Sequence, residues 1–139
     1  MVCISISKDI TTLNGHTDTI RCVKAVASDR AVSSSRDFTI RVWNIITGEC
    51  QAILEGHTGT VRTLAYNKNI LVSASYDSTA RIWSLENQEP INQECIHVLR
   101  GHKGQIYSAV CDEKKVVTAG LGGEVMVWEI MTGYVYACV

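Results

Sequence analysis

Residues 71–83 read LVSASYDSTARIW, which is two runs of β-forming residues separated by Tyr76, Asp77 and Ser78. An aspartate between two such runs favours a tight bend, because its side chain accepts hydrogen bonds from the backbone that follows it. The stretch therefore predicts a β-hairpin. The same pattern occurs at residues 31–43, AVSSSRDFTIRVW, and at residues 116–128, VVTAGLGGEVMVW, where Gly122 replaces the aspartate.

Each predicted hairpin lies in a longer repeat that starts at a Gly-His pair and ends at a tryptophan. The histidines are His16, His57 and His102, and the tryptophans are Trp43, Trp83 and Trp128. The tryptophans follow their histidines after 27, 26 and 26 residues, and they lie 40 and 45 residues apart. A period of about 40 to 45 residues is typical of the four-stranded blades of a β-propeller.

A fourth β-rich run completes each unit, so we expect an all-β fold of three four-stranded blades. The run follows a turn at Thr47-Gly48 in the first unit and at Thr132-Gly133 in the third. In the second unit this connection is five residues longer and contains Pro90, the only proline, which predicts a surface loop.

The repeat boundaries predict an incomplete propeller. We expect an outer strand of a preceding blade in residues 1–13, and repeats at residues 14–54, 55–99 and 100–139. Three blades cannot form a closed ring, and open edge strands promote aggregation. We therefore expect the missing blades to come from a longer parent chain or from self-assembly, unless the gene has decayed.

Composition narrows the classes of function. The 139 residues carry 13 basic and 14 acidic side chains, so the chain is no polycation for nucleic acid. No run of about 20 apolar residues predicts a membrane span, and the N-terminus has no export signal. The six cysteines have no CxxC spacing, so we expect no metal and no other cofactor, and we interpret them as small buried residues in a reducing intracellular compartment.

A polar network recurs in each unit. Its members are His16, Ser33, Asp37 and Trp43 in the first unit, His57, Ser73, Asp77 and Trp83 in the second, and His102, Thr118 and Trp128 in the third. A Ser-His-Asp catalytic system is needed only once, whereas this set is repeated with a tryptophan each time. We therefore expect hydrogen-bonded structural networks and no enzyme. His97 lies outside the pattern, and we expect it to be an ordinary strand residue.

Six side chains at equivalent positions form the predicted binding surface. They are Arg21, Arg62 and Tyr107, five residues after each histidine, and Arg36, Tyr76 and Leu121, immediately before each turn position. We expect them to converge on one face around the central channel. Three guanidinium groups held together favour an anionic ligand, and their planar donors suit a phosphate. The alternative is three independent solvated arginines with local acidic partners such as Asp18.

The Gly-His, Ser-x-x-x-Asp and Trp elements resemble the WD-repeat family of β-propellers over essentially the whole chain. The dipeptides Trp43-Asn44, Trp83-Ser84 and Trp128-Glu129 depart from the family's Trp-Asp. The six surface residues resemble three consecutive blades of the F-box/WD-repeat substrate receptors of the cell-division-control type.

That second resemblance implies a function and a location. It implies recognition of a phosphorylated protein segment for an SCF-type ubiquitin ligase, in the nucleus or cytoplasm, with the arginines on a phosphothreonine. Asp18 departs from the small hydroxyl residue that would suit phosphate there. The alternative function is a WD-repeat interaction scaffold that needs no phosphate.

Overall fold

The computed structural model describes residues 11–139 and confirms an all-β fold, with no helix in that range and therefore none that could cross a membrane. The strands form three four-stranded antiparallel sheets in chain order. Blade 1 contains β1 (Ile20–Ala25), β2 (Arg30–Ser35), β3 (Ile40–Asn44) and β4 (Cys50–Leu54). Blade 2 contains β5 (Val61–Asn67), β6 (Ile70–Ser75), β7 (Thr79–Ser84) and β8 (Cys95–Arg100). Blade 3 contains β9 (Ile106–Cys111), β10 (Lys115–Gly120), β11 (Val125–Glu129) and β12 (Val135–Cys138).

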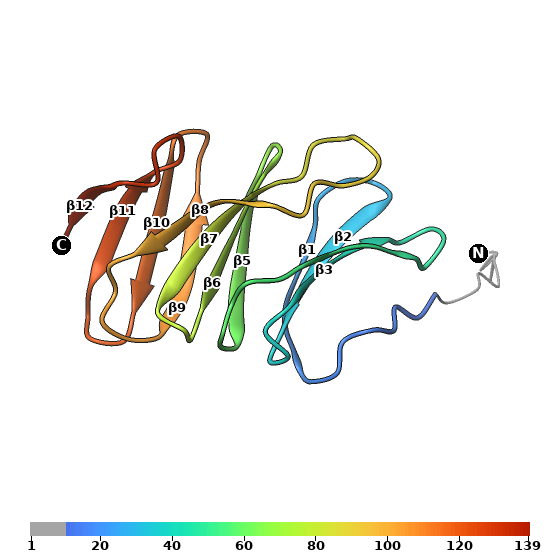
Figure 1. Ribbon diagram of the computed structural model, residues 1–139, viewed down its shortest axis with the longest axis horizontal. Coiled ribbons are helices and arrows are strands. Elements are labelled where there is room, and N and C mark those ends of the chain that lie inside the picture. The colour runs from blue at the N-terminus through green and yellow to red at the C-terminus, as the bar shows by residue number, and fades with distance from the viewer. Residues whose placement is uncertain (1–10) are drawn as a thin grey trace, which may run out of the picture.

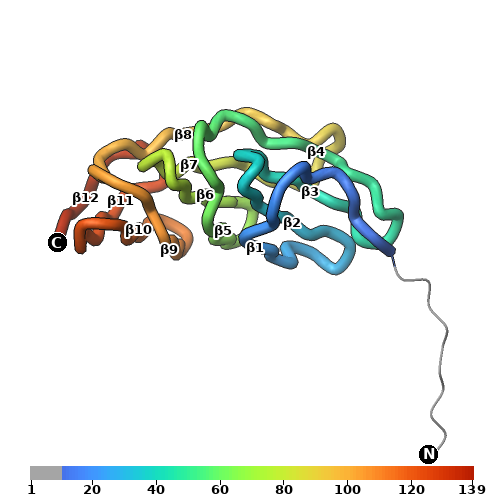
Figure 2. Tube along the Cα trace, turned by 90° about the horizontal axis from the view of Figure 1, so that it is seen from below, coloured from blue at the N-terminus to red at the C-terminus, as the bar shows by residue number. Residues whose placement is uncertain are grey.

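The blades follow one another along the long axis of the molecule (Figure 1). The first strands of the blades, β1, β5 and β9, contact one another in sequence and form the inner side of the array. The last strands, β4, β8 and β12, form the outer edges, and the view from below shows the blades as successive layers (Figure 2). This arrangement brings equivalent positions of the three repeats to the same face.

The hairpin turns are built by local hydrogen bonds. In blade 1 the carboxylate of Asp37 accepts a hydrogen bond from the Thr39 backbone N–H at 2.9 Å. Asp77 accepts the equivalent bond from Thr79 at 2.8 Å. The residue between them has a positive φ, 72° at Phe38 and 71° at Ser78, and a glycine with φ 77° holds the same place in blade 3. The turn sequence thus fixes the register of β2 with β3 and of β6 with β7.

The hydrophobic core lies between blades. One cluster joins blades 1 and 2 and includes Val32, Val42 and Val61. A second cluster joins blades 2 and 3 and includes Val72, Ile82 and Ile106. Since each buried cluster combines side chains of two adjacent blades, stacking of the blades removes most apolar surface from water.

The long connection between β7 and β8 is largely exposed, as expected of a surface loop, but two of its apolar side chains are buried. Pro90 is exposed, but Leu85 and Ile91 are buried in the cluster between blades 1 and 2. The buried side chain of Arg30 donates to Asn87 at 3.2 Å, which ties this connection to blade 1. The connection between β7 and β8 thus adds two apolar side chains to the core.

The interpretation of the cysteines as buried residues is wrong, because none of the five in the described residues is fully buried. Cys50 in β4 and Cys138 in β12 are exposed. Cys22, Cys95 and Cys111 are half-buried and free. Cys3 and most of the strand expected in residues 1–13 lie outside the described residues, and residues 11–13 form no strand.

Candidate functional site

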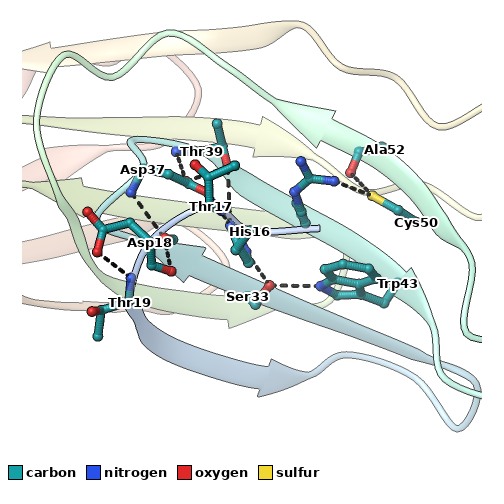
Figure 3. Close-up of polar contacts among 12 residues, drawn as sticks. His16, Thr17, Asp18, Thr19, Ser33, Asp37, Thr39, Trp43, Cys50 and Ala52 are labelled. Atoms are coloured by element: carbon teal, nitrogen blue, oxygen red, sulfur yellow. Dashed lines mark hydrogen bonds and ion pairs between the residues drawn. The ribbon is translucent and has the colours of Figure 1, made fainter. Parts of the chain in front are cut away.

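A chain of hydrogen bonds links strands β2 and β3 of blade 1 to the Gly-His segment (Figure 3). The indole N–H of Trp43 donates to Ser33 Oγ at 2.7 Å. Ser33 Oγ lies 2.7 Å from His16 Nε2, and His16 Nδ1 lies 2.8 Å from Asp37 Oδ2. With the imidazole proton on Nδ1, every donor in this chain has an acceptor.

Blade 2 contains the same network. Trp83 donates to Ser73 Oγ at 2.9 Å, and Ser73 Oγ lies 2.8 Å from His57 Nε2. His57 Nδ1 lies 2.7 Å from Asp77 Oδ2. Ser73 is fully buried, and its hydroxyl is hydrogen-bonded to both the histidine and the tryptophan.

The carboxylates of both networks are held in the charged form. For Asp37, burial alone would raise the pKa, but hydrogen bonds from Thr39, His16 and Thr17 outweigh it and lower the pKa. For Asp77, burial is likewise outweighed by hydrogen bonds from His57 and Thr79, so this pKa is also lowered. Each aspartate therefore stabilises the fold as an anion.

The network of blade 3 is incomplete. Thr118 Oγ1 lies 2.7 Å from His102 Nε2 and accepts from the Trp128 indole at 2.8 Å. Within residues 11–139, however, the buried Nδ1 of His102 has no hydrogen-bond partner. Glu124 brings its carboxylate only to 3.9 Å from that nitrogen. Burial lowers the pKa of His102, and the charge of Glu124 opposes this only in part.

Three of the six predicted surface residues occupy β-bulges. The pairing of β1 with β2 shifts between Ile20 and Cys22, which leaves Arg21 as the extra residue. The equivalent shifts leave Arg62 in β5 and Tyr107 in β9 as extra residues. A bulge leaves one residue outside the ladder and turns its side chain away from the regular alternation. These three equivalent positions therefore share the same β-bulge conformation.

The other three residues lie beside the bulges. The backbone N–H of Arg36 donates to Thr19 O at 2.9 Å, and that of Tyr76 donates to Thr60 O at the same distance. Leu121 makes the equivalent bond to Gln105 O at 2.7 Å. In every blade, therefore, the hairpin turn is hydrogen-bonded to the start of the inner strand. We call these six residues, Arg21, Arg36, Arg62, Tyr76, Tyr107 and Leu121, the candidate surface.

The charges of the candidate surface lack local compensation. Arg21 and Arg36 are exposed and Arg62 is half-buried. Within residues 11–139, no carboxylate lies within 4.0 Å of any of these three guanidinium groups. The carboxylate of Asp18 accepts a hydrogen bond from its neighbour Thr19 at 2.6 Å instead (Figure 3).

The aromatic residues of the candidate surface meet across a blade boundary. The rings of Tyr76 and Tyr107 make an edge-to-face contact with centroids 5.3 Å apart. The Tyr107 hydroxyl donates to Gln105 at 2.9 Å. This contact joins blades 2 and 3 at repeat positions equivalent to those of the arginines in blades 1 and 2, and Leu121 is exposed.

Two network members, Thr39 and Thr79, were not predicted from the sequence. Thr39 and Thr79 donate to Asp37 and Asp77 at 2.6 Å, and Glu124 holds the equivalent place in blade 3. A threonine two residues after each aspartate recurs in the sequence, and this repeat could have predicted the roles of Thr39 and Thr79. His97 is in β8 as expected, and its Nε2 lies 2.9 Å from Met131 O.

Comparison with known families gives a match over most of the chain. The family described as "WD domain, G-beta repeat" matches residues 7–44, 48–84 and 93–129. Each matched segment ends one residue after the tryptophan of a network, so the match covers the strands and turns that build the blades.

Three curated relatives cover about half of the chain. Nuclear distribution protein PAC1-2 of Uncinocarpus reesii is 36% identical over 89 residues, 56% of this chain and 19% of the relative. Mitochondrial division protein 1 of Pyricularia oryzae is 39% identical over 77 residues, 52% of this chain and 11% of the relative. Apoptotic protease-activating factor 1 of Rattus norvegicus is 35% identical over 83 residues, 58% of this chain and 7% of the relative. The chain thus spans a fifth or less of these proteins.

A solved structure matches nearly all of this chain. The crystal structure of the computationally designed Ika8 protein superposes with a TM-score of 0.83 and 29% identity, over 94% of this chain and 39% of that one. The three curated names refer to no F-box protein and no ubiquitin ligase, so the comparisons support a WD40 protein-interaction domain and not the finer receptor type. This chain belongs to the WD40-repeat family, and its three repeats form three blades of a propeller-like fold.

Proposed function

We propose that the candidate surface binds a phosphorylated segment of a protein partner without catalysing any reaction. The observation that supports this most is the set of three arginines, Arg21, Arg36 and Arg62, with no carboxylate partner within residues 11–139. Two of them occupy bulges, which orient a side chain away from the sheet, and the third lies on the adjacent turn. A dianionic phosphate offers enough acceptors for several guanidinium groups.

The partner would be a phosphorylated regulator, and the chain would present it as part of an intracellular substrate receptor of an SCF-type ubiquitin ligase. This part of the proposal rests on the similarity of the six surface residues to the F-box/WD-repeat receptors. In that arrangement the arginines bind phosphothreonine, and the pair Tyr76 and Tyr107 borders the phosphate.

The test uses an array of phosphothreonine peptides beside the same peptides without phosphate. We expect the chain to retain only phosphorylated members, and calorimetry on the strongest one to show that Arg36→Ala weakens binding by roughly 30-fold or more, since about 2 kcal/mol is lost when a phosphate loses a charged donor. Lys24→Ala is the matched control, because Lys24 is an exposed cation further along β1. It should change affinity by less than about threefold. Equal retention of both peptide sets would contradict the proposal.

The second candidate function is protein docking that needs no phosphate. The contact between Tyr76 and Tyr107 and the exposed Leu121 favour it, because aromatic side chains anchor many protein interfaces. Added inorganic phosphate and salt distinguish the two functions. Both should weaken arginine-phosphate binding strongly and leave aromatic docking nearly unchanged.

A further inference from the structure

The interfaces inside the chain show how one blade packs on the next. Between blades 1 and 2, Val32, Ile40 and Val42 pack with Val61 and Leu64 of the inner strand β5. Between blades 2 and 3, the equivalent residues pack in the same way. These are Val72, Ala80 and Ile82 of blade 2 with Ile106 and Ala109 of β9. Each blade thus presents side chains from its middle strands to the inner strand of its successor.

Blade 3 carries the same presenting face without a successor in residues 11–139. Val117 pairs with Val127 in β10 and β11, as Val72 pairs with Ile82 in blade 2. Val125 is 38% exposed, whereas its equivalent Ala80 is 0% exposed. Val110 of β9 is 60% exposed. We call Val110, Val117, Val125 and Val127 the blade 3 end face.

Blade 1 carries the receiving half of the same interface. Ile20 and Val23 of β1 hold the positions of Val61 and Leu64 in β5, because each pair stands at the same spacing from its Gly-His. Ile20 is 47% exposed and Val23 is 61% exposed, whereas Val61 and Leu64 are 0% and 1% exposed. We call Ile20 and Val23 the blade 1 end face. Within the described residues no blade packs on this face, whereas blade 1 packs on the equivalent face of blade 2.

We propose that copies of this chain associate head to tail, with the blade 3 end face of one copy packed on the blade 1 end face of another. A second copy is the occupant favoured by the structure, because every copy carries both halves of an interface that already occurs twice within it. Head-to-tail contacts of this kind close into rings when the rotation per copy allows it, and closure removes the open faces. A net charge of −1 imposes little repulsion between copies.

The test measures the mass of the full 139-residue chain by light scattering over a range of concentrations. We expect a mass of at least two copies at high concentration. Val23→Glu and Val110→Glu should each raise the concentration needed for assembly by roughly tenfold or more, because either change puts a charge into one half of the interface. Ile46→Glu is the matched control, since Ile46 is 71% exposed on the β3–β4 turn, and it should assemble like the parent chain.

Mixing the two variants tests the direction of the contact. Each variant retains one intact end face, so the mixture should form a one-to-one dimer that neither variant forms alone. Circular dichroism checks the fold, and the β-branched variants Val23→Thr and Val110→Thr repeat the test if a glutamate variant loses its sheet signal. A monomer at all concentrations, assembly of Val23→Glu equal to that of the parent, or loss of assembly in Ile46→Glu would overturn the proposal. None of these outcomes depends on phosphate, so they leave the proposed function to its own test.

Discussion

The stability of each blade's hairpin depends on single side chains of its polar network. Asp37 and Asp77 each accept bonds from a histidine, a threonine hydroxyl and backbone N–H groups. In blade 3, Gly122 removes this acceptor, and Glu124 replaces it only at 3.9 Å from the histidine. A buried nitrogen without a partner costs about 1–3 kcal/mol, so the hairpin of blade 3 is the least stabilised of the three.

The variant Asp77→Asn tests the value of the anionic network. The amide keeps the shape but loses the charge, so we expect the free energy of unfolding to fall by about 2 kcal/mol, measured by urea titration at pH 7. Asp29→Asn is the control, because Asp29 is exposed and lies in a turn, and it should cost less than about 0.5 kcal/mol.

The same variant should change the acid limb of the stability curve. The lowered pKa of Asp77 means that the unfolded chain binds a proton more readily than the folded one below the ordinary value of 3.8. The stability that this aspartate contributes is complete above that value and is lost as pH falls through the folded pKa. Asp77→Asn should lose less stability than the parent chain below pH 3.8, and an unchanged acid limb would contradict this account.

Among the elements, the β7–β8 connection contributes more than a link between strands. It places Leu85 and Ile91 in the cluster between blades 1 and 2 and is tied to blade 1 by Arg30. The cost of closing a longer loop is small, and the buried apolar groups offset it. This connection therefore works as a brace between two blades.

Ile91→Ala tests whether the β7–β8 connection stabilises the packing of blade 1 on blade 2. Ile96→Ala is the control, because it removes the same atoms from an exposed position in β8. We expect the buried site to cost about 2–4 kcal/mol in chemical unfolding, because a cavity is left between the blades. The exposed site should cost less than about 1 kcal/mol. Equal losses at both sites would mean that the connection does not stabilise the packing of blade 1 on blade 2.

In the whole molecule, blade 2 is the best-protected unit. It contributes to both interblade clusters, whereas blades 1 and 3 each pack on one neighbour within residues 11–139. In repeat arrays each unit is stabilised mainly by its nearest neighbours. Local opening should therefore require most energy in the middle of the array.

Hydrogen exchange measured by mass spectrometry tests this order. We expect the slowest amide exchange in β5, β6 and β7, and faster exchange in the strands of blades 1 and 3, at a protein concentration where the chain is monomeric. Blade 3 should exchange faster than blade 1 if the incomplete His102 network matters. Uniform exchange across the blades would contradict nearest-neighbour stabilisation.

The amino-acid sequence by itself determined the hairpins, the blade period and most members of the polar networks. These features depend on contacts that recur at fixed spacing, such as Asp77 with His57 and Ser73 with Trp83. They could therefore be predicted from the repeat in the sequence. For the candidate surface, the sequence predicted only which repeat positions its residues occupy. Its bulges at Arg21, Arg62 and Tyr107 depend on the register between strands, which the pattern of residue types does not reveal.

Only the tertiary structure decided which equivalent residues are covered. Val61 and Ile20 stand at the same place in their repeats, yet one is buried and the other exposed, because burial depends on whether a neighbouring blade is present. Ile91 is buried and Cys50 exposed for the same kind of reason, namely contact, or its absence, with chain distant in sequence. Local spacing specifies strands and turns, whereas exposure is a property of the packed array.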